Sequence, residues 1–409
     1  MLKRDFLRTC LALAALPAAG CVSRSQSLAL PDEAPSAQDA KTLWSRMFRR
    51  LPPELSVLTA DPRYRVQIVY APLRHDDDGQ LHVEDVFTWQ LDNEHWFPAM
   101  SLVKLPMALL VAETLSAYHV GFDSRLELDR RPVNGEWPDG EPDRELVARS
   151  LRRMLVASDN APFNRFYDFI GPEALNSRLA AMGYANARII SRLGVEPGRD
   201  QRSTVSGSLL SGSGRPVLRW PARTSPVLTV GLEHTTLGTA WVDAKGHQQN
   251  TPMDFAGANY LPLQDAFDML RALLYPEQTP PRRRWAINAS LRAQLIEMLG
   301  LTPRESIDPQ FPAAQFPDSG NAYFVTGDSG TRERAPKLTL TGKNGMAYGY
   351  VGDVRYLHDS EARAQCLLAA VIYCNADGVI NDDQYEVESI GIPFLAALGR
   401  AALAVSREL

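Results

Sequence analysis

The chain has 409 residues, of which 45% are hydrophobic and 22% charged, and its formal net charge is −5. This length leaves room for one large domain or two ordinary ones with a sizeable core. The mild negative charge argues against a nucleic-acid partner and a polybasic membrane patch, and beyond the first twenty residues we expect no membrane-spanning run.

The first 21 residues, MLKRDFLRTCLALAALPAAGC, have the order of an export signal: basic residues, a short apolar stretch, then small residues before Cys21. Residues 18–21 resemble the bacterial lipobox, in which the cysteine carries lipid and becomes the mature N-terminus. Residues 3–8 resemble a twin-arginine export motif with lysine in first place, so this route and general secretion both stay open. We expect a lipid anchor at Cys21 on the periplasmic side of the cell envelope; an ordinary cleaved signal is the alternative.

Residues 22–38 are polar and lack periodicity, which predicts a tether between the anchor and a folded domain over 39–409. That domain begins with a helical pattern through Leu51. Alternating patterns then predict strands at 65–71 and 85–91.

The stretch 95–117, HWFPAMSLVKLPMALLVAETLSA, predicts a helix buried in the core, because 102–112 is apolar except for Lys104. A lone buried ammonium is costly unless it has a partner or a role. Ser101 lies three residues earlier, on the same helix face, at or next to the N-cap. There the positive helix end favours an alkoxide and the lysine can take the proton. The alternative is a capping serine with a lysine that reaches the surface.

The middle of the chain predicts helices at 144–156, 162–169 and 171–183, and again at 261–274 and 289–299. The segment at about 198–257 is rich in Ser, Thr, Gly and Pro. It lacks the aliphatic residues for its own core, so we interpret it as an insertion of hairpins or long loops.

The clearest strand patterns come last, at 337–341, 347–357 and 365–374, and a helix over 388–403 follows. Cys366 and Cys374 would stand about 26 Å apart along one strand, too far for a disulfide. The five predicted strands can form one antiparallel sheet with the N- and C-terminal helices on one face, which is an α+β arrangement.

Two further motifs follow the Ser101-Leu-Val-Lys104 helix: Ser158-Asp159-Asn160, and Lys343-Asn344-Gly345 between two late strands. Together they resemble SxxK, SDN and KTG, the signature of class A β-lactamases and related penicillin-binding proteins. The resemblance covers residues 40–409 apart from the insertion. It implies a β-lactamase/transpeptidase-like α+β fold, with a five-stranded antiparallel sheet flanked by helices and a mostly helical lobe that carries Ser101 and Ser158.

The resemblance also assigns roles in acyl transfer. Ser101 would be the nucleophile and Lys104 its base. Ser158 would relay a proton to the leaving nitrogen, and Asn160 would orient a substrate amide and contact Lys104. For Asp159 we favour a structural role as a helix cap or loop brace.

In the third motif, Lys343 would face a substrate carboxylate and polarise Ser158. Asn344 replaces the family's Thr or Ser; an amide could donate the same hydrogen bond to the substrate but is larger. Gly345 completes the motif, and the backbone N–H of Met346 would form an oxyanion hole with that of Ser101. A surface turn with Asn-Gly chemistry is the alternative for this segment.

A hydrolase also needs a group that activates the deacylating water, which in class A enzymes is a glutamate on a loop after SDN. Glu196, followed by Pro197, resembles the start of that pattern, but Asp200 stands where the family has asparagine. Glu196 is thus the candidate base, with a solvated loop carboxylate as the alternative.

No cofactor and no metal are expected, because the seven histidines are scattered without HExxH or a His/Cys cluster. We expect a monomeric serine hydrolase that cleaves β-lactams through an acyl-enzyme. The alternatives are a D-alanyl-D-alanine peptidase or transpeptidase that acts on peptidoglycan peptides, a penicillin-binding sensor, and a non-catalytic binding module.

Overall fold

The computed structural model describes residues 35–75, 78–93, 95–129, 144–195, 200–228, 232–330 and 332–409. The predicted signal, the Cys21 anchor and most of the predicted tether lie outside these residues, and so does Glu196. The helix expected from residue 39 is present as α2 (Ala37–Phe48).

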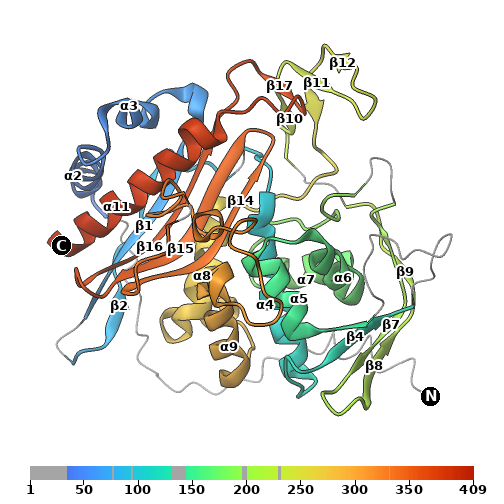
Figure 1. The fold of residues 1–409 in the computed structure, drawn as a ribbon. Helices are drawn as coiled ribbons and strands as arrows, with labels where there is room; N and C mark the ends of the chain where they lie inside the picture. Colours follow the sequence, from blue (N-terminus) through green and yellow to red (C-terminus); the bar gives the residue numbers. More distant parts are fainter. Residues whose placement is uncertain are drawn as a thin grey trace, which may run out of the picture.

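The central sheet is antiparallel throughout, and its strands lie in the order β14-β15-β16-β1-β2, with β3 also paired to β1 (Figure 1). It therefore has six strands where the sequence predicted five. The additional strand arises because the nine-residue β1 is long enough to pair with two short strands in succession. The strands are β1 (Gln67–His75), β2 (Leu81–Val83), β3 (Phe87–Trp89), β14 (Leu338–Ala347), β15 (Tyr350–Asp359) and β16 (Ala364–Tyr373).

Both faces of this sheet are buried, and the residues of β16 alternate between two hydrophobic clusters. Cys366, Leu368 and Ala370 pack on one face, whereas Leu367 and Ala369 pack on the other. This explains why the strand sequence CLLAAVIYC is apolar without alternation. Cys366 and Cys374 are buried free thiols, as expected.

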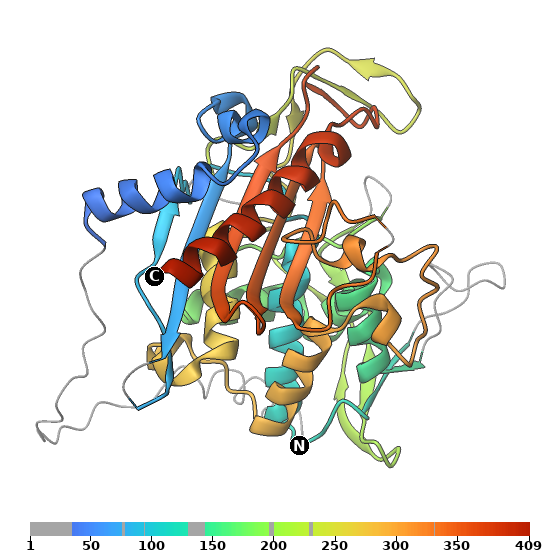
Figure 2. The same cartoon turned by 60° about the vertical axis from the view of Figure 1, so that its left-hand side comes forward.

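The helices α2 and α11 (Ile392–Glu408) cover one face of the sheet, as the sequence predicted (Figure 2). A π-helical turn over Val387–Gly391 precedes α11. Two helical stretches, Met100–Ala117 and Val387–Glu408, are long and apolar enough to cross a membrane, contrary to our expectation. Their apolar residues lie within the core clusters, since 72% and 61% of the two windows are buried.

The other face of the sheet packs against the mostly helical lobe, whose centre is α4 (Lys104–Ala117). Its helices are α4, α5 (Val147–Val156), α6 (Asn160–Ile170), α7 (Pro172–Ala181), α8 (Leu263–Leu274) and α9 (Ala289–Gly300). Two single-turn helices lie elsewhere, α3 (Pro53–Ser56) and α10 (Asp318–Asn321). The α+β fold is thus confirmed.

Lys343, Asn344 and Gly345 lie within β14, so the prediction that they stand between two strands was wrong. The turn to β15 comes later, at Tyr348 and Gly349, which have φ angles of 53° and 79°. Two consecutive positive φ angles are what a tight two-residue hairpin requires. The Asn344-Gly345 pair had suggested a turn at those two residues. The turn lies at Tyr348-Gly349 instead.

The described part of the predicted insertion at 198–257 forms short strands. The hairpin of β7 (Gly207–Leu210) and β8 (Pro216–Trp220) joins a small sheet in the order β5-β4-β7-β8 beside the helical lobe. In that sheet, β4 spans Arg125–Leu128 and β5 spans Arg144–Leu146. The other short strands of the described residues form three small sheets, β6-β9, β10-β13 and β12-β11-β17. Their bounds are β6 (Ser203–Thr204), β9 (Arg223–Thr224), β10 (Thr236–Leu237), β11 (Ala240–Val242), β12 (Gln248–Gln249), β13 (Met253–Asp254) and β17 (Val379–Ile380).

Candidate active site

The structure brings Ser101, Lys104, Ser158 and Asn160 together around one amine. The Nζ of Lys104 lies 3.0 Å from the Oγ of Ser101, 3.2 Å from the Oγ of Ser158 and 2.8 Å from the Oδ1 of Asn160. It also donates a short hydrogen bond to the carbonyl oxygen of Ser158. The first two motifs therefore meet as the resemblance implied.

Ser101 occupies a 3₁₀ turn, Met100–Val103, that leads into α4, so it precedes the N-cap, Val103, instead of standing at or next to it as we had expected. Its side chain does not cap α4, which was the alternative interpretation. Met100, directly before it, has a φ of 52°. A positive φ is unfavourable for a residue with a long side chain, so the surrounding packing must stabilise this backbone conformation. The Ser101 side chain is half-buried, and the strained turn fixes it next to the lysine.

Two glycines let this turn approach the sheet. Gly345 of β14 and Gly352 of β15 are register partners. A β-carbon at 345 would stand 2.5 Å from the backbone nitrogen of Ser101. One at 352 would stand 2.8 Å from the Cγ1 of Val371 in β16 and 3.2 Å from the Cε of Met100. Only Gly345 was singled out from the sequence, because the role of Gly352 depends on how the two strands pair.

Gly345→Ala should slow acylation of Ser101 by a β-lactam about 100-fold, because its methyl group would displace the nucleophile by a sizeable part of an ångström. The rate is measurable as adduct formation by stopped-flow or intact-mass spectrometry. Gly257→Ala is the matched control, since a β-carbon there meets open space. Equal rates for the two variants would contradict the proposed contact.

The Lys104 side chain is fully buried, and this burial lowers the pKa of its amine to about 7. The Asp159 carboxylate opposes the effect by favouring the charged form. Asp159 caps α6 by accepting a hydrogen bond of 3.0 Å from the Ala161 N–H, and it is ion-paired with Arg153 at 2.5 Å. The structural role that we favoured for Asp159 agrees with these contacts.

A neutral amine at Lys104 has two N–H donors and one lone pair. Two of its four neighbours, the Ser158 carbonyl and the Asn160 amide oxygen, can only accept hydrogen bonds. When the two N–H groups donate to these oxygens, the lone pair can accept a hydrogen bond from a hydroxyl. Of the two nearby hydroxyls, that of Ser101 is nearer, at 3.0 Å, than that of Ser158. The arrangement prepares a neutral lysine to take the serine proton.

The third motif supplies a second buried lysine. Lys343 is 1% exposed. Its amine donates to two oxygens of Asn344, the backbone carbonyl at 2.9 Å and the side-chain Oδ1 at 3.1 Å. Burial, with the charges of Lys104 and Arg355, lowers the pKa of Lys343 well below its usual value. A substrate carboxylate beside it would favour the charged form.

The Asn344 side chain forms its hydrogen bonds with other groups of the protein. This side chain is buried, and its Nδ2 donates to the carbonyl oxygen of Gly320 at 2.8 Å while its Oδ1 accepts from Lys343. The amide is therefore not presented to a substrate here, and its larger size explains why it reaches α10 instead. Met346 is 44% exposed, and together with the exposed Asn160 it marks the open side of the site.

Within the described ranges, no group of three or more His, Cys, Asp or Glu side chains could hold a metal ion. Sequence reasoning missed Asn164 and Arg192, which hold the loop that follows α7 on α6, and Gly194, which lies against Asn160. Their positions depend on contacts across a loop, for which the sequence offers no local signal.

Similarity to a known family covers the first two motifs. A model described as "Beta-lactamase enzyme family" matches residues 68–337, a stretch that includes Ser101, Lys104 and Ser158 and ends before Lys343. No curated protein matches the chain significantly.

Three solved structures are similar to this chain. TLA-3 extended-spectrum beta-lactamase is 10% identical, with 89% of this chain and 98% of that chain covered and a TM-score of 0.50. A beta-lactamase from Sphaerobacter thermophilus is 15% identical, with 90% and 98% covered and a TM-score of 0.47. PBP-A is 13% identical, with 88% and 95% covered and a TM-score of 0.46. At 10% identity, the likeness to TLA-3 concerns the fold alone. The family model matches well over half of the chain, so the chain belongs to the beta-lactamase enzyme family.

Proposed function

We propose that this member of the beta-lactamase family hydrolyses β-lactams through an acyl-enzyme on Ser101. The observation that carries the proposal is the buried Lys104 amine, with a lowered pKa of about 7 and a 3.0 Å contact to the Ser101 hydroxyl. At neutral pH a large fraction of this amine is neutral, which is the state a general base requires.

In the first half of the reaction, Lys104 takes the proton of Ser101 while the oxygen attacks the amide carbonyl carbon. When the C–N bond breaks, the proton passes from Lys104 through the Ser158 hydroxyl, 3.2 Å away, to the leaving nitrogen. A water molecule then attacks the ester, and the acid and the free serine are released. Lys343 would face the substrate carboxylate.

A second candidate is a penicillin-binding peptidase that keeps its β-lactam adduct. On the loop after the second motif, the described Gly194 lies against Asn160 and Leu193 lies against Asn164, and neither residue has a side chain that can act as a base. If they stand where the water is activated, deacylation is slow and the peptidase function is favoured.

Intact-mass spectrometry after brief exposure to benzylpenicillin tests the proposal and separates the two candidates. We expect a mass increase equal to one penicillin on the wild type and none on Ser101→Ala. A transient adduct with release of penicilloic acid supports the β-lactamase, whereas an adduct that lasts for hours supports the peptidase. No adduct on the folded wild type would exclude both.

A further inference from the structure

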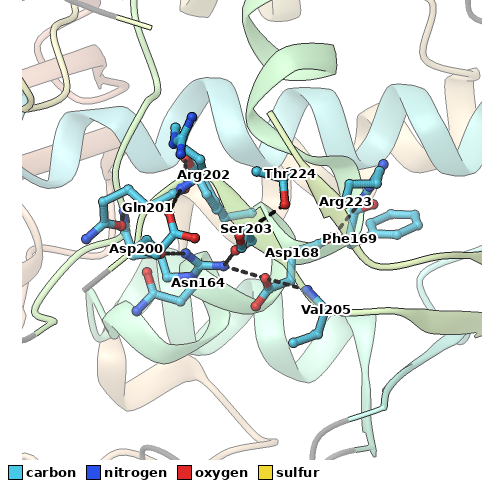
Figure 3. A network of polar contacts seen from close by, with 12 residues as sticks. Asn164, Asp168, Phe169, Asp200, Gln201, Arg202, Ser203, Val205, Arg223 and Thr224 are labelled. Carbon is cyan, nitrogen blue, oxygen red and sulfur yellow. Dashed lines mark hydrogen bonds and ion pairs between the residues drawn. The ribbon is translucent and has the colours of Figure 1, made fainter. Parts of the chain in front are cut away.

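A buried ion pair ties the start of the loop after α7 to α6. The Nη2 of Arg192 lies 2.6 Å from the Oδ1 of Asp168, and both side chains are less than 9% exposed. The same Nη2 donates to the carbonyl oxygen of Ser203 at 2.8 Å. The Arg192 guanidinium therefore joins Asp168 of α6 to the backbone at Ser203, and Figure 3 shows Asp168 and Ser203 close together.

Two further contacts fix the start of this loop on the same helix. The Asn164 amide donates to the Leu193 carbonyl at 2.9 Å and accepts from the Leu193 N–H at 2.8 Å. Asn164 lies one helical turn after Asn160, which is the first residue of α6. The loop backbone at Leu193 and the Asn160 side chain are thus parts of one rigid unit.

Gly194 follows directly and lies against Asn160. A β-carbon built at position 194 would stand 2.7 Å from the Nδ2 of Asn160, closer than such atoms approach in proteins. The backbone of Gly194 has a φ of 61°. The Nδ2 of Asn160 points toward Gly194, and its Oδ1 accepts a hydrogen bond from the Nζ of Lys104 at 2.8 Å.

We propose that Gly194 is a positioning residue for Lys104, acting through Asn160, and that the Arg192–Asp168 pair holds it in place. The absence of a side chain at 194 leaves the room in which the Asn160 oxygen accepts a hydrogen bond from the lysine. This acceptor occupies one N–H of the neutral amine and so directs the lone pair to the Ser101 hydroxyl. The inference rests on the proposed acyl transfer and extends it to a loop residue with no reacting group.

Gly194→Ala should slow acylation by benzylpenicillin about 100-fold, because the β-carbon displaces the Asn160 amide. The pH midpoint of acylation should also fall, because loss of an acceptor destabilises the charged form of Lys104. Gly214→Ala is the matched control: its φ of 82° gives similar backbone strain, but a β-carbon there meets nothing within 4 Å. Its acylation rate and midpoint should equal those of the wild type.

A double-mutant cycle separates positioning from a general loss of structure. In an Asn160→Ala background, Gly194→Ala should cause no further slowing, because the side chain that it displaces is gone. Gly194→Asn, which tolerates a positive φ but keeps a β-carbon, should be as slow as Gly194→Ala. Full slowing in the Asn160→Ala background, or recovery with Gly194→Asn, would overturn the inference.

The outcome also distinguishes this inference from the proposed function. If the wild type is not acylated at all, the proposed function fails, and the Lys104 pKa measured by NMR titration still tests whether Gly194 acts on the lysine. If the wild type is acylated and Gly194→Ala behaves like Gly214→Ala, only the inference fails. Should Gly194→Ala not fold, Gly194→Asn and Arg192→Met carry the same comparison, the latter with a smaller expected slowing.

Discussion

Replacing Lys104 by methionine should slow acylation of Ser101 about 10²- to 10⁴-fold, the range expected when a general base is removed. Methionine is apolar and close to lysine in length, so it suits the fully buried position in α4. The variant should therefore fold, and its loss of acylation should reflect the missing amine. The measurement is the rate of adduct formation with a β-lactam under single-turnover conditions.

The pH profile of the wild type makes this prediction specific. Because burial lowers the pKa of Lys104 to about 7, the neutral fraction of the amine rises as pH increases through 7. The acylation rate should rise over the same interval and level off above it. This rise should be absent from the residual rate of Lys104→Met and unchanged in Lys41→Met, which removes an exposed lysine of α2. A wild-type rate that falls as pH rises through 7 would show that another group is the base.

The first two motifs were predictable from the sequence because their geometry is local. Ser101 and Lys104 are three residues apart where a short helical turn enters a helix, so they share a face whatever surrounds them. The uninterrupted apolar residues around Lys104 indicated that its amine would be buried. That burial is the physical cause of its lowered pKa.

Other parts of the site depend on long-range pairing that no local pattern encodes. The approach of Gly345 to Ser101 requires the register of β14 against β15 and the docking of the 3₁₀ turn. Arg192 pairs with Asp168, which lies 24 residues earlier in the chain. We expected the Asn344 amide to donate a hydrogen bond to the substrate, but it donates to the carbonyl oxygen of Gly320. The position of Gly320 depends on how the chain before β14 folds. Such contacts follow from tertiary packing, which overrides the preferences of a short motif.

The buried pair of Asp353 and Arg355 should dominate the stability of the region behind Lys343. These residues lie two apart on β15, and their Nε and Oδ1 atoms are 2.8 Å apart with both side chains at most 1% exposed. Asp353 also accepts the backbone N–H groups of Tyr323 and Phe324, while Arg355 donates to the carbonyl oxygen of Leu340 at 3.1 Å. The pair thus joins the sheet to the segment that follows Gly320.

Asp353→Leu should lower the free energy of unfolding by about 3–5 kcal/mol, because it leaves the Arg355 charge buried without its partner. Urea unfolding followed by circular dichroism measures this loss. Asp328→Ala removes one side of the exposed pair with Arg400 and should cost less than about 1 kcal/mol. The double variant Asp353→Leu/Arg355→Met should cost less than the sum of its single variants, since no charge is then left unpaired. If Asp353→Leu cost no more than Asp328→Ala, the buried pair would not anchor the chain that holds Asn344 and, through it, Lys343.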